Sequence, residues 1–163
     1  MAKNSEYNLV FWGKSFDEAA ATLFITELRQ AGLRVKLVGL DGRNPSGAHG
    51  LALVPDWTIS EAQLQEQNIT SIILPCSPTL WHRVATDPRV ANFIQTTHTN
   101  GTSLVVREME FDSSTKQKAF DSLFTVKHVI TYPVQDKLLP FIRNLVTRML
   151  PTSSQTRSAG QAA

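Results

Sequence analysis

The chain has 163 residues, of which 42% are hydrophobic and 18% charged, a composition that suits one globular domain with a sizeable core. The net charge of +2 is too small, and the basic residues are too scattered, to indicate a nucleic-acid-binding protein. The single cysteine, Cys76, excludes an internal disulfide and a cysteine-rich metal site, and no apolar run reaches the length of a membrane span.

Strands and helices alternate from the first residues onward. Residues 8–12 form an apolar run typical of a buried parallel strand, and apolar residues at helical spacing predict a helix over 17–31. Ser15 and Glu18 have the spacing of a capping box, in which each side chain satisfies a free backbone N–H at the start of the helix. A second strand over 34–40 completes a βαβ unit.

The alternation continues through the middle of the chain. Asp87 and Pro88 predict a helix start, because aspartate caps free N–H groups and proline is favoured at the first helical position. This helix ends at Asn100-Gly101, where a buried strand follows. The other predicted segments are a loop or hairpin over 41–50, a short strand over 51–54, a short helix over 58–64, and buried strands over 71–74 and 103–106.

The last third of the chain is less regular. We predict a polar helix over 111–123, a strand over 127–132 and a final helix over 138–149, followed by a tail over 151–163 that has nothing to bury. The chain therefore divides into one α/β domain over 1–150 and a disordered C-terminal tail. The repeated βαβ pattern predicts a flavodoxin-like open sheet, mostly parallel, with helices on both faces.

Several segments resemble the ThiJ/PfpI family of class I glutamine-amidotransferase-like proteins, which includes the Parkinson-linked deglycase. The resemblance covers residues 8–106 almost without gaps and resumes over 129–150. It implies the same flavodoxin-like fold, and it leads us to expect a homodimer, because family members commonly form dimers. The segments that carry it are Ser15–Glu18, Leu28–Gly32, Leu40–Gly42, Val54–Ala62, Ile72–Pro75 and Asp87–Val90.

The resemblance fails at the three positions that carry the family's chemistry. The nucleophilic cysteine, which family enzymes place on a sharp turn after the fourth core strand, is replaced by Arg107, and Glu108 stands where a histidine usually follows. The glutamate on the first helix is replaced by Ala20, while Glu18 lies half a turn away. The Gly-Gly pair that helps to form the oxyanion site is replaced by Cys76-Ser77. These departures predict that the family's thiol chemistry is lost.

Two of these positions allow a second interpretation. Cys76 is either a small buried side chain or a relocated nucleophile, with His82 or His49 as its base, although no helix start is evident beside it. Arg107 either plugs the former pocket together with Glu108 or binds an anion such as a carboxylate or a phosphate. The four histidines show no metal-ligand spacing, so we expect neither a metal nor a cofactor.

The leading hypothesis is a non-catalytic pseudoenzyme that acts as a protein- or ligand-binding regulatory module. Its former active-site pocket would be lined by Arg107, Glu108, Cys76, Ser77, Ala20 and Glu18. We expect a cytoplasmic homodimer with a protein partner whose identity the sequence does not reveal. One alternative is a thiol-dependent hydrolase or glyoxalase-like enzyme that uses Cys76, and another is an assembly or scaffold factor for a larger complex.

Overall fold

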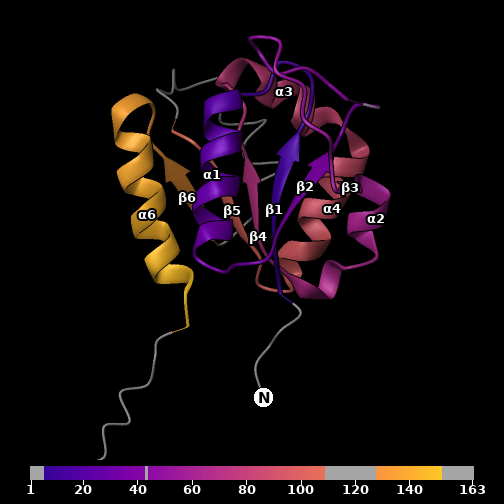
Figure 1. Cartoon of the computed structure of the whole chain (residues 1–163). Helices are drawn as coiled ribbons and strands as arrows, with labels where there is room; N and C mark the ends of the chain where they lie inside the picture. Colours follow the sequence, from indigo (N-terminus) through magenta and orange to yellow (C-terminus); the bar gives the residue numbers. More distant parts are fainter. Residues whose placement is uncertain (1–5, 43, 109–127, 152–163) are drawn as a thin grey trace, which may run out of the picture.

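A parallel β-sheet forms the centre of the protein (Figure 1). The computed structural model describes residues 6–42, 44–108 and 128–151. Within them six strands pair in the order β3-β2-β1-β4-β5-β6, and every pairing is parallel. The strands are β1 (Tyr7–Trp12), β2 (Val35–Gly39), β3 (Trp57–Thr58), β4 (Ile69–Leu74), β5 (Ser103–Arg107) and β6 (Val129–Tyr132). Apart from the two-residue edge strand β3, this is the strand order of flavodoxin-like folds, as predicted.

Helices cover both faces of this sheet, which also confirms the predicted fold class (Figure 1). On one face Phe24 of α1 packs edge-to-face on Tyr132 of β6, with ring centroids 5.3 Å apart, and α6 lies beside α1. On the other face Phe93 of α4 packs on Phe11 of β1 at 6.0 Å. The helices are α1 (Glu18–Gln30), α2 (Ile59–Gln63), α3 (Pro78–Thr86), α4 (Pro88–Thr99) and α6 (Leu138–Met149), with single 3₁₀ turns over Glu66–Asn68 and Gln135–Lys137.

Most of the predicted helix ends are found where the sequence placed them. The carboxylate of Asp87 caps α4 by accepting a hydrogen bond from the backbone N–H of Arg89 at 2.9 Å. Gly32 follows α1 with φ 81°, and Gly101 follows α4 with φ 85°. Both glycines adopt the left-handed conformation that ends a helix, which costs other residues energy.

The predicted capping box at Ser15 is wrong. Ser15 lies two residues before the helix cap with φ 66°, and the cap of α1 is Asp17, whose Oδ1 accepts from the backbone N–H of Ala20 at 3.0 Å. Asp17 lies next to the first helical residue, so its short carboxylate reaches the free N–H groups directly. Glu18, the other half of the predicted box, makes different contacts that are described below.

Two other predictions are wrong, and two lie outside the described residues. The segment 51–54 forms no strand, because its one sheet-like contact is an isolated antiparallel bridge between Ser46 and Ala52. Helix α3 was not predicted, since Pro75 and Pro78 suggested a loop, but Pro78 occupies the first helical turn, where its missing N–H is not needed. The predicted helix over 111–123 and the tail beyond residue 151 fall outside the described part of the chain.

Candidate functional site

The carboxyl edge of the sheet is the candidate site. Open α/β sheets bind ligands beyond the carboxyl ends of their strands, where the strand order reverses, and here that point lies between β1 and β4. The start of α1 is fastened to this point, because the backbone N–H of Asp17 donates to the carbonyl of Pro75 at 2.8 Å. All six predicted pocket residues lie at or beside this edge: Glu18 and Ala20 at the start of α1, Cys76 and Ser77 after β4, and Arg107 and Glu108 at the end of β5.

Arg107 occupies a regular strand position. It is the last residue of β5 and pairs in register with Tyr132 of β6. The pairing continues past it, since the backbone N–H of Glu108 donates to the carbonyl of Tyr132 at 2.8 Å. Among the described non-glycine residues, a positive φ occurs at Ser15, Asn44 and Gln135 and not at Arg107. Arg107 itself is therefore part of a regular strand, and the residues that would complete the turn expected to begin at Arg107-Glu108 lie outside the described part of the chain.

The position of the expected acid is filled by a buried methyl group. Ala20 is fully buried in α1. Glu18 lies on another face of the helix, and its Oε1 accepts from the backbone N–H groups of His49 and Leu51, each at 2.8 Å. Glu18 therefore fastens the loop 45–51 to the start of α1, and its carboxylate is engaged by amides rather than presented to a thiol.

The loop 45–51 also contacts Trp12 at the end of β1. The indole Nε1 of Trp12 donates to the carbonyl of Pro45 at 2.9 Å in a buried hydrogen bond. Gly47 passes so close that a Cβ there would lie 2.3 Å from Cγ of Glu18 and 2.7 Å from Cη2 of Trp12. Only glycine fits this approach without displacing either side chain. His49 on the same loop is 88% exposed and lies 3.7 Å from Glu18, so it faces solvent rather than the interior.

Cys76 is fully buried at the carboxyl end of β4. The sequence suggested no helix beside it, but α3 begins at Pro78 with Ser77 as its cap, and a helix start favours a thiolate. Burial outweighs this effect and raises the pKa of the Cys76 thiol to about 12, although the guanidinium groups of Arg83 and Arg107 partly oppose the rise. The thiol is therefore neutral near pH 7. The side chain of His82, the other predicted base, lies outside the described residues.

Tyr132 is a site residue that the sequence did not reveal. Its side chain is fully buried, and its hydroxyl has no hydrogen-bond partner among the residues that the structure describes. Burial raises the pKa of this hydroxyl far above its ordinary value, so the phenol is neutral. A tyrosine at the end of a short strand carries no motif, and only the pairing of β6 with β5 places it beside Arg107.

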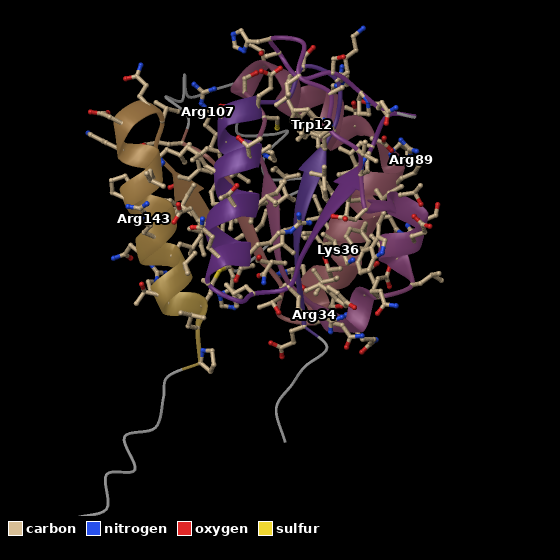
Figure 2. The ribbon with its side chains drawn as sticks, in the orientation of Figure 1. Trp12, Arg34, Lys36, Arg89, Arg107 and Arg143 are labelled. Carbon is tan, nitrogen blue, oxygen red and sulfur yellow. The ribbon has the colours of Figure 1, made fainter. Side chains whose placement is uncertain are left out.

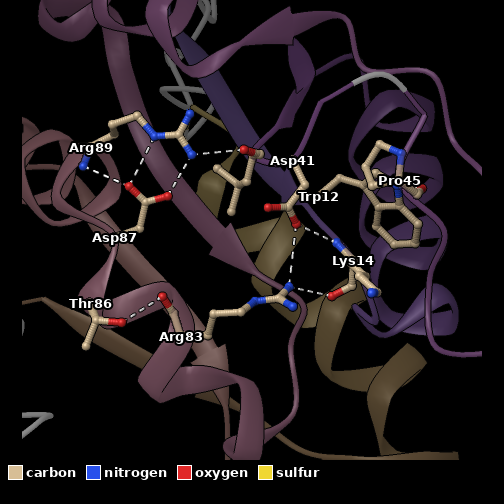
Figure 3. A network of polar contacts seen from close by, with 9 residues as sticks. Trp12, Lys14, Asp41, Pro45, Arg83, Thr86, Asp87 and Arg89 are labelled. Carbon is tan, nitrogen blue, oxygen red and sulfur yellow. Dashed lines mark hydrogen bonds and ion pairs between the residues drawn. The ribbon is translucent and has the colours of Figure 1, made fainter.

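A polar network joins the neighbouring loops at this edge of the sheet (Figure 3). Oδ2 of Asp41 accepts from the backbone N–H of Lys14 at 2.8 Å, and Arg83 donates to the carbonyl of Lys14 at 2.7 Å. Arg89 bridges the carbonyl of Leu40 and the carboxylate of Asp87, which it contacts at 2.7 Å. This contact lowers the pKa of Asp87. A pocket of about 60 Å³ that is partly open to solvent lies beside the network, and it has room for about two waters and not for a metabolite.

Neither a metal site nor a membrane span emerges from the described part of the chain. No group of three or more His, Cys, Asp or Glu side chains within it is arranged to hold a metal ion. None of the helices described in it is long and apolar enough to cross a membrane.

Comparisons with known proteins agree with this architecture. Residues 8–106 match the model of the DJ-1/PfpI family. Schizosaccharomyces pombe DJ-1 superposes with a TM-score of 0.68 at 11% identity, covering 90% of this chain and 93% of that one. Toxoplasma gondii DJ-1 in its oxidized form gives a TM-score of 0.67 at 14% identity over 88% and 90%. Drosophila melanogaster DJ-1beta gives 0.63 at 12% identity over 88% of each chain. No curated protein matches the chain.

Proposed function

The chain belongs to the DJ-1/PfpI family, and we propose that it is a non-catalytic member that acts as a protein- or ligand-binding regulatory module. The observation that carries this proposal is the backbone at Arg107, which continues as a strand through the hydrogen bond of Glu108 to Tyr132. A thiol nucleophile needs both a cysteine and a sharp turn to present it, whereas this position carries an arginine in a regular strand.

The buried side chains around this position support the same proposal. Ala20 supplies no acid, and its methyl group is fully buried. Cys76 is buried too, and its raised pKa of about 12 keeps the side chain in the protonated thiol form, which is a poor nucleophile. The alternative of a hydrolase or glyoxalase-like enzyme that uses Cys76 would require the opposite environment, with an exposed thiol of lowered pKa.

The proposal predicts no turnover that depends on Cys76. With activated esters and small dicarbonyls as substrates, the wild-type protein and Cys76→Ser should give rates equal to each other and to the buffer blank. Substrate loss is followed by absorbance, and the unfolding transition of each variant shows that it is folded. A rate above the blank that disappears in Cys76→Ser would exclude a non-catalytic protein.

A groove beside α1 supports the expected homodimer. It has a volume of about 220 Å³ and is open to solvent. Val54, one of its lining residues, is 79% exposed. A two-fold axis would place the Val54 rim of each copy against the groove of the other. The groove is lined by Thr22, Ile25, Thr26, Arg29, Leu37, Leu53, Val54 and Asp56.

A charge on the rim of this groove should therefore separate the dimer. Val54→Asp would bury two carboxylates in the interface, and we expect the dissociation constant to rise by roughly a hundredfold or more. Leu64→Asp is the matched control, because Leu64 is 81% exposed but lies on the other side of the sheet, at the end of α2. Sedimentation velocity over a concentration series measures the dissociation constant of wild type and of each variant. If wild type is a monomer throughout, or if both variants behave alike, the groove is not the dimer interface.

A further inference from the structure

Arg107 and Tyr132 lie side by side on neighbouring strands. They are partners in the parallel register of β5 and β6, so their side chains leave the same face of the sheet. Tyr132 packs on Phe24 of α1, which identifies that face as the one covered by α1 and α6. Figure 2 shows Arg107 at the carboxyl edge of the sheet, on the side where α1 and α6 begin. A guanidinium and a phenol are thus carried by paired positions of neighbouring strands, at the edge where this type of sheet binds ligands.

Both groups have unused hydrogen-bonding capacity. No described residue forms an ion pair or a side-chain hydrogen bond with Arg107, which is partly exposed. The Tyr132 hydroxyl is buried and likewise has no partner within residues 6–42, 44–108 and 128–151. A buried hydroxyl without a partner is uncommon, and a bound molecule is one of the few explanations for it.

Two charged groups act on the Tyr132 hydroxyl, the guanidinium of Arg107 and the carboxylate of Asp17. The carboxylate of Asp17 is itself engaged, because Oδ1 accepts from the N–H of Ala20 at the start of α1. The start of this helix adds a partial positive charge at the same place.

We propose that Arg107 and Tyr132 form a binding site for a small oxyanion, a carboxylate or a phosphate, at the carboxyl edge of β5 and β6. The guanidinium of Arg107 contacts the anion from the solvent side, and the hydroxyl of Tyr132 donates a hydrogen bond to it from the interior. The proposal rests on the non-catalytic function proposed above and specifies the ligand of the same region. An arginine at the nucleophile position then has a role in binding.

Isothermal titration with inorganic phosphate, and separately with acetate, tests this site. Wild type should bind at least one of the two probes saturably in the millimolar range. Arg107→Gln should weaken binding by roughly tenfold or more, because charge-assisted hydrogen bonds are the strong ones. Arg148→Gln is the matched control, since it removes the same charge from an exposed position of α6 and should leave binding unchanged. Phosphate and acetate arms together show which oxyanion class the site prefers.

Tyr132→Phe separates a role in binding from a role in folding. It removes a hydroxyl that has no protein partner, so the variant should be at least as stable as wild type in urea, while it binds the probe roughly threefold to tenfold more weakly. Saturable binding that Arg107→Gln leaves unchanged would overturn the site, and so would the absence of binding by wild type to either probe. Both results leave the non-catalytic function standing, because that function is contradicted by turnover above the buffer blank and not by a failure to bind these anions.

Discussion

In the native protein at pH 7, Cys76 should react with a chromogenic disulfide reagent at least roughly a hundredfold more slowly than in the unfolded chain. Burial raises its pKa to about 12, whereas a free cysteine has a pKa of about 8.5, so the thiolate population falls by about three and a half powers of ten. The higher pKa makes the remaining thiolate more nucleophilic, which recovers about half of this factor on a logarithmic scale. The full burial of the side chain then slows access of the reagent.

The comparison uses one protein in two states. Labelling is followed by absorbance in buffer and again in guanidinium chloride, where Cys76 should react completely and fast. Cys76→Ser gives the background, since the chain has one cysteine. A native rate within tenfold of the unfolded rate would mean that the thiol is accessible, and the relocated-nucleophile hypothesis would return.

Trp12→Ala should cost about 3–5 kcal/mol of the free energy of unfolding, in the range of large-to-small substitutions in a core. The Trp12 ring is fully buried, packs on Phe16 at 6.3 Å and donates to the carbonyl of Pro45. The substitution leaves a cavity and also leaves that buried carbonyl without its donor. It should therefore loosen the loop 45–51 together with the end of β1.

Trp57→Ala is the matched control for this substitution. Trp57 is only partly buried in β3, where Tyr7 and Lys36 contact its ring, and its loss should cost about 1–2 kcal/mol. Urea unfolding followed by circular dichroism measures both variants. If Trp12→Ala costs no more than Trp57→Ala, then Trp12 does not anchor the loop.

The fold could be predicted because its signals are local. Apolar runs mark β1, β4 and β5, and the spacing of apolar residues marks α1 and α6. Asp87-Pro88 at the start of α4 needs no distant partner to work as a cap. Alternation of such elements is then enough to indicate a parallel sheet with helices on both faces.

The errors at the site arise from contacts between distant segments. Glu18 has the sequence spacing of a cap, but its carboxylate binds the amides of His49 and Leu51, about thirty positions away along the chain. Pro75 and Pro78 suggested a loop, although the second of them starts α3 beside Cys76. Tyr132 could not be identified at all, because its position depends on the register between β5 and β6.

The proposed loss of the nucleophile, by contrast, rests on residue identity, which can be read from the sequence without the fold. Arg107 and Ala20 lack the groups that thiol chemistry needs, wherever the backbone places them. The structure adds that the backbone at Arg107 is a regular strand. Restoring a cysteine at this position would therefore not restore the geometry of the turn.

The measurement that tests the account most directly is the pH dependence of the alkylation rate of native Cys76. Because the folded pKa is raised to about 12, the rate should keep rising with pH through the ordinary cysteine range, with no plateau at or below about 8.5. Unfolded protein should show the ordinary inflection near that value. An inflection of the native profile below it would reveal an activated thiolate at Cys76 and would contradict a non-catalytic protein.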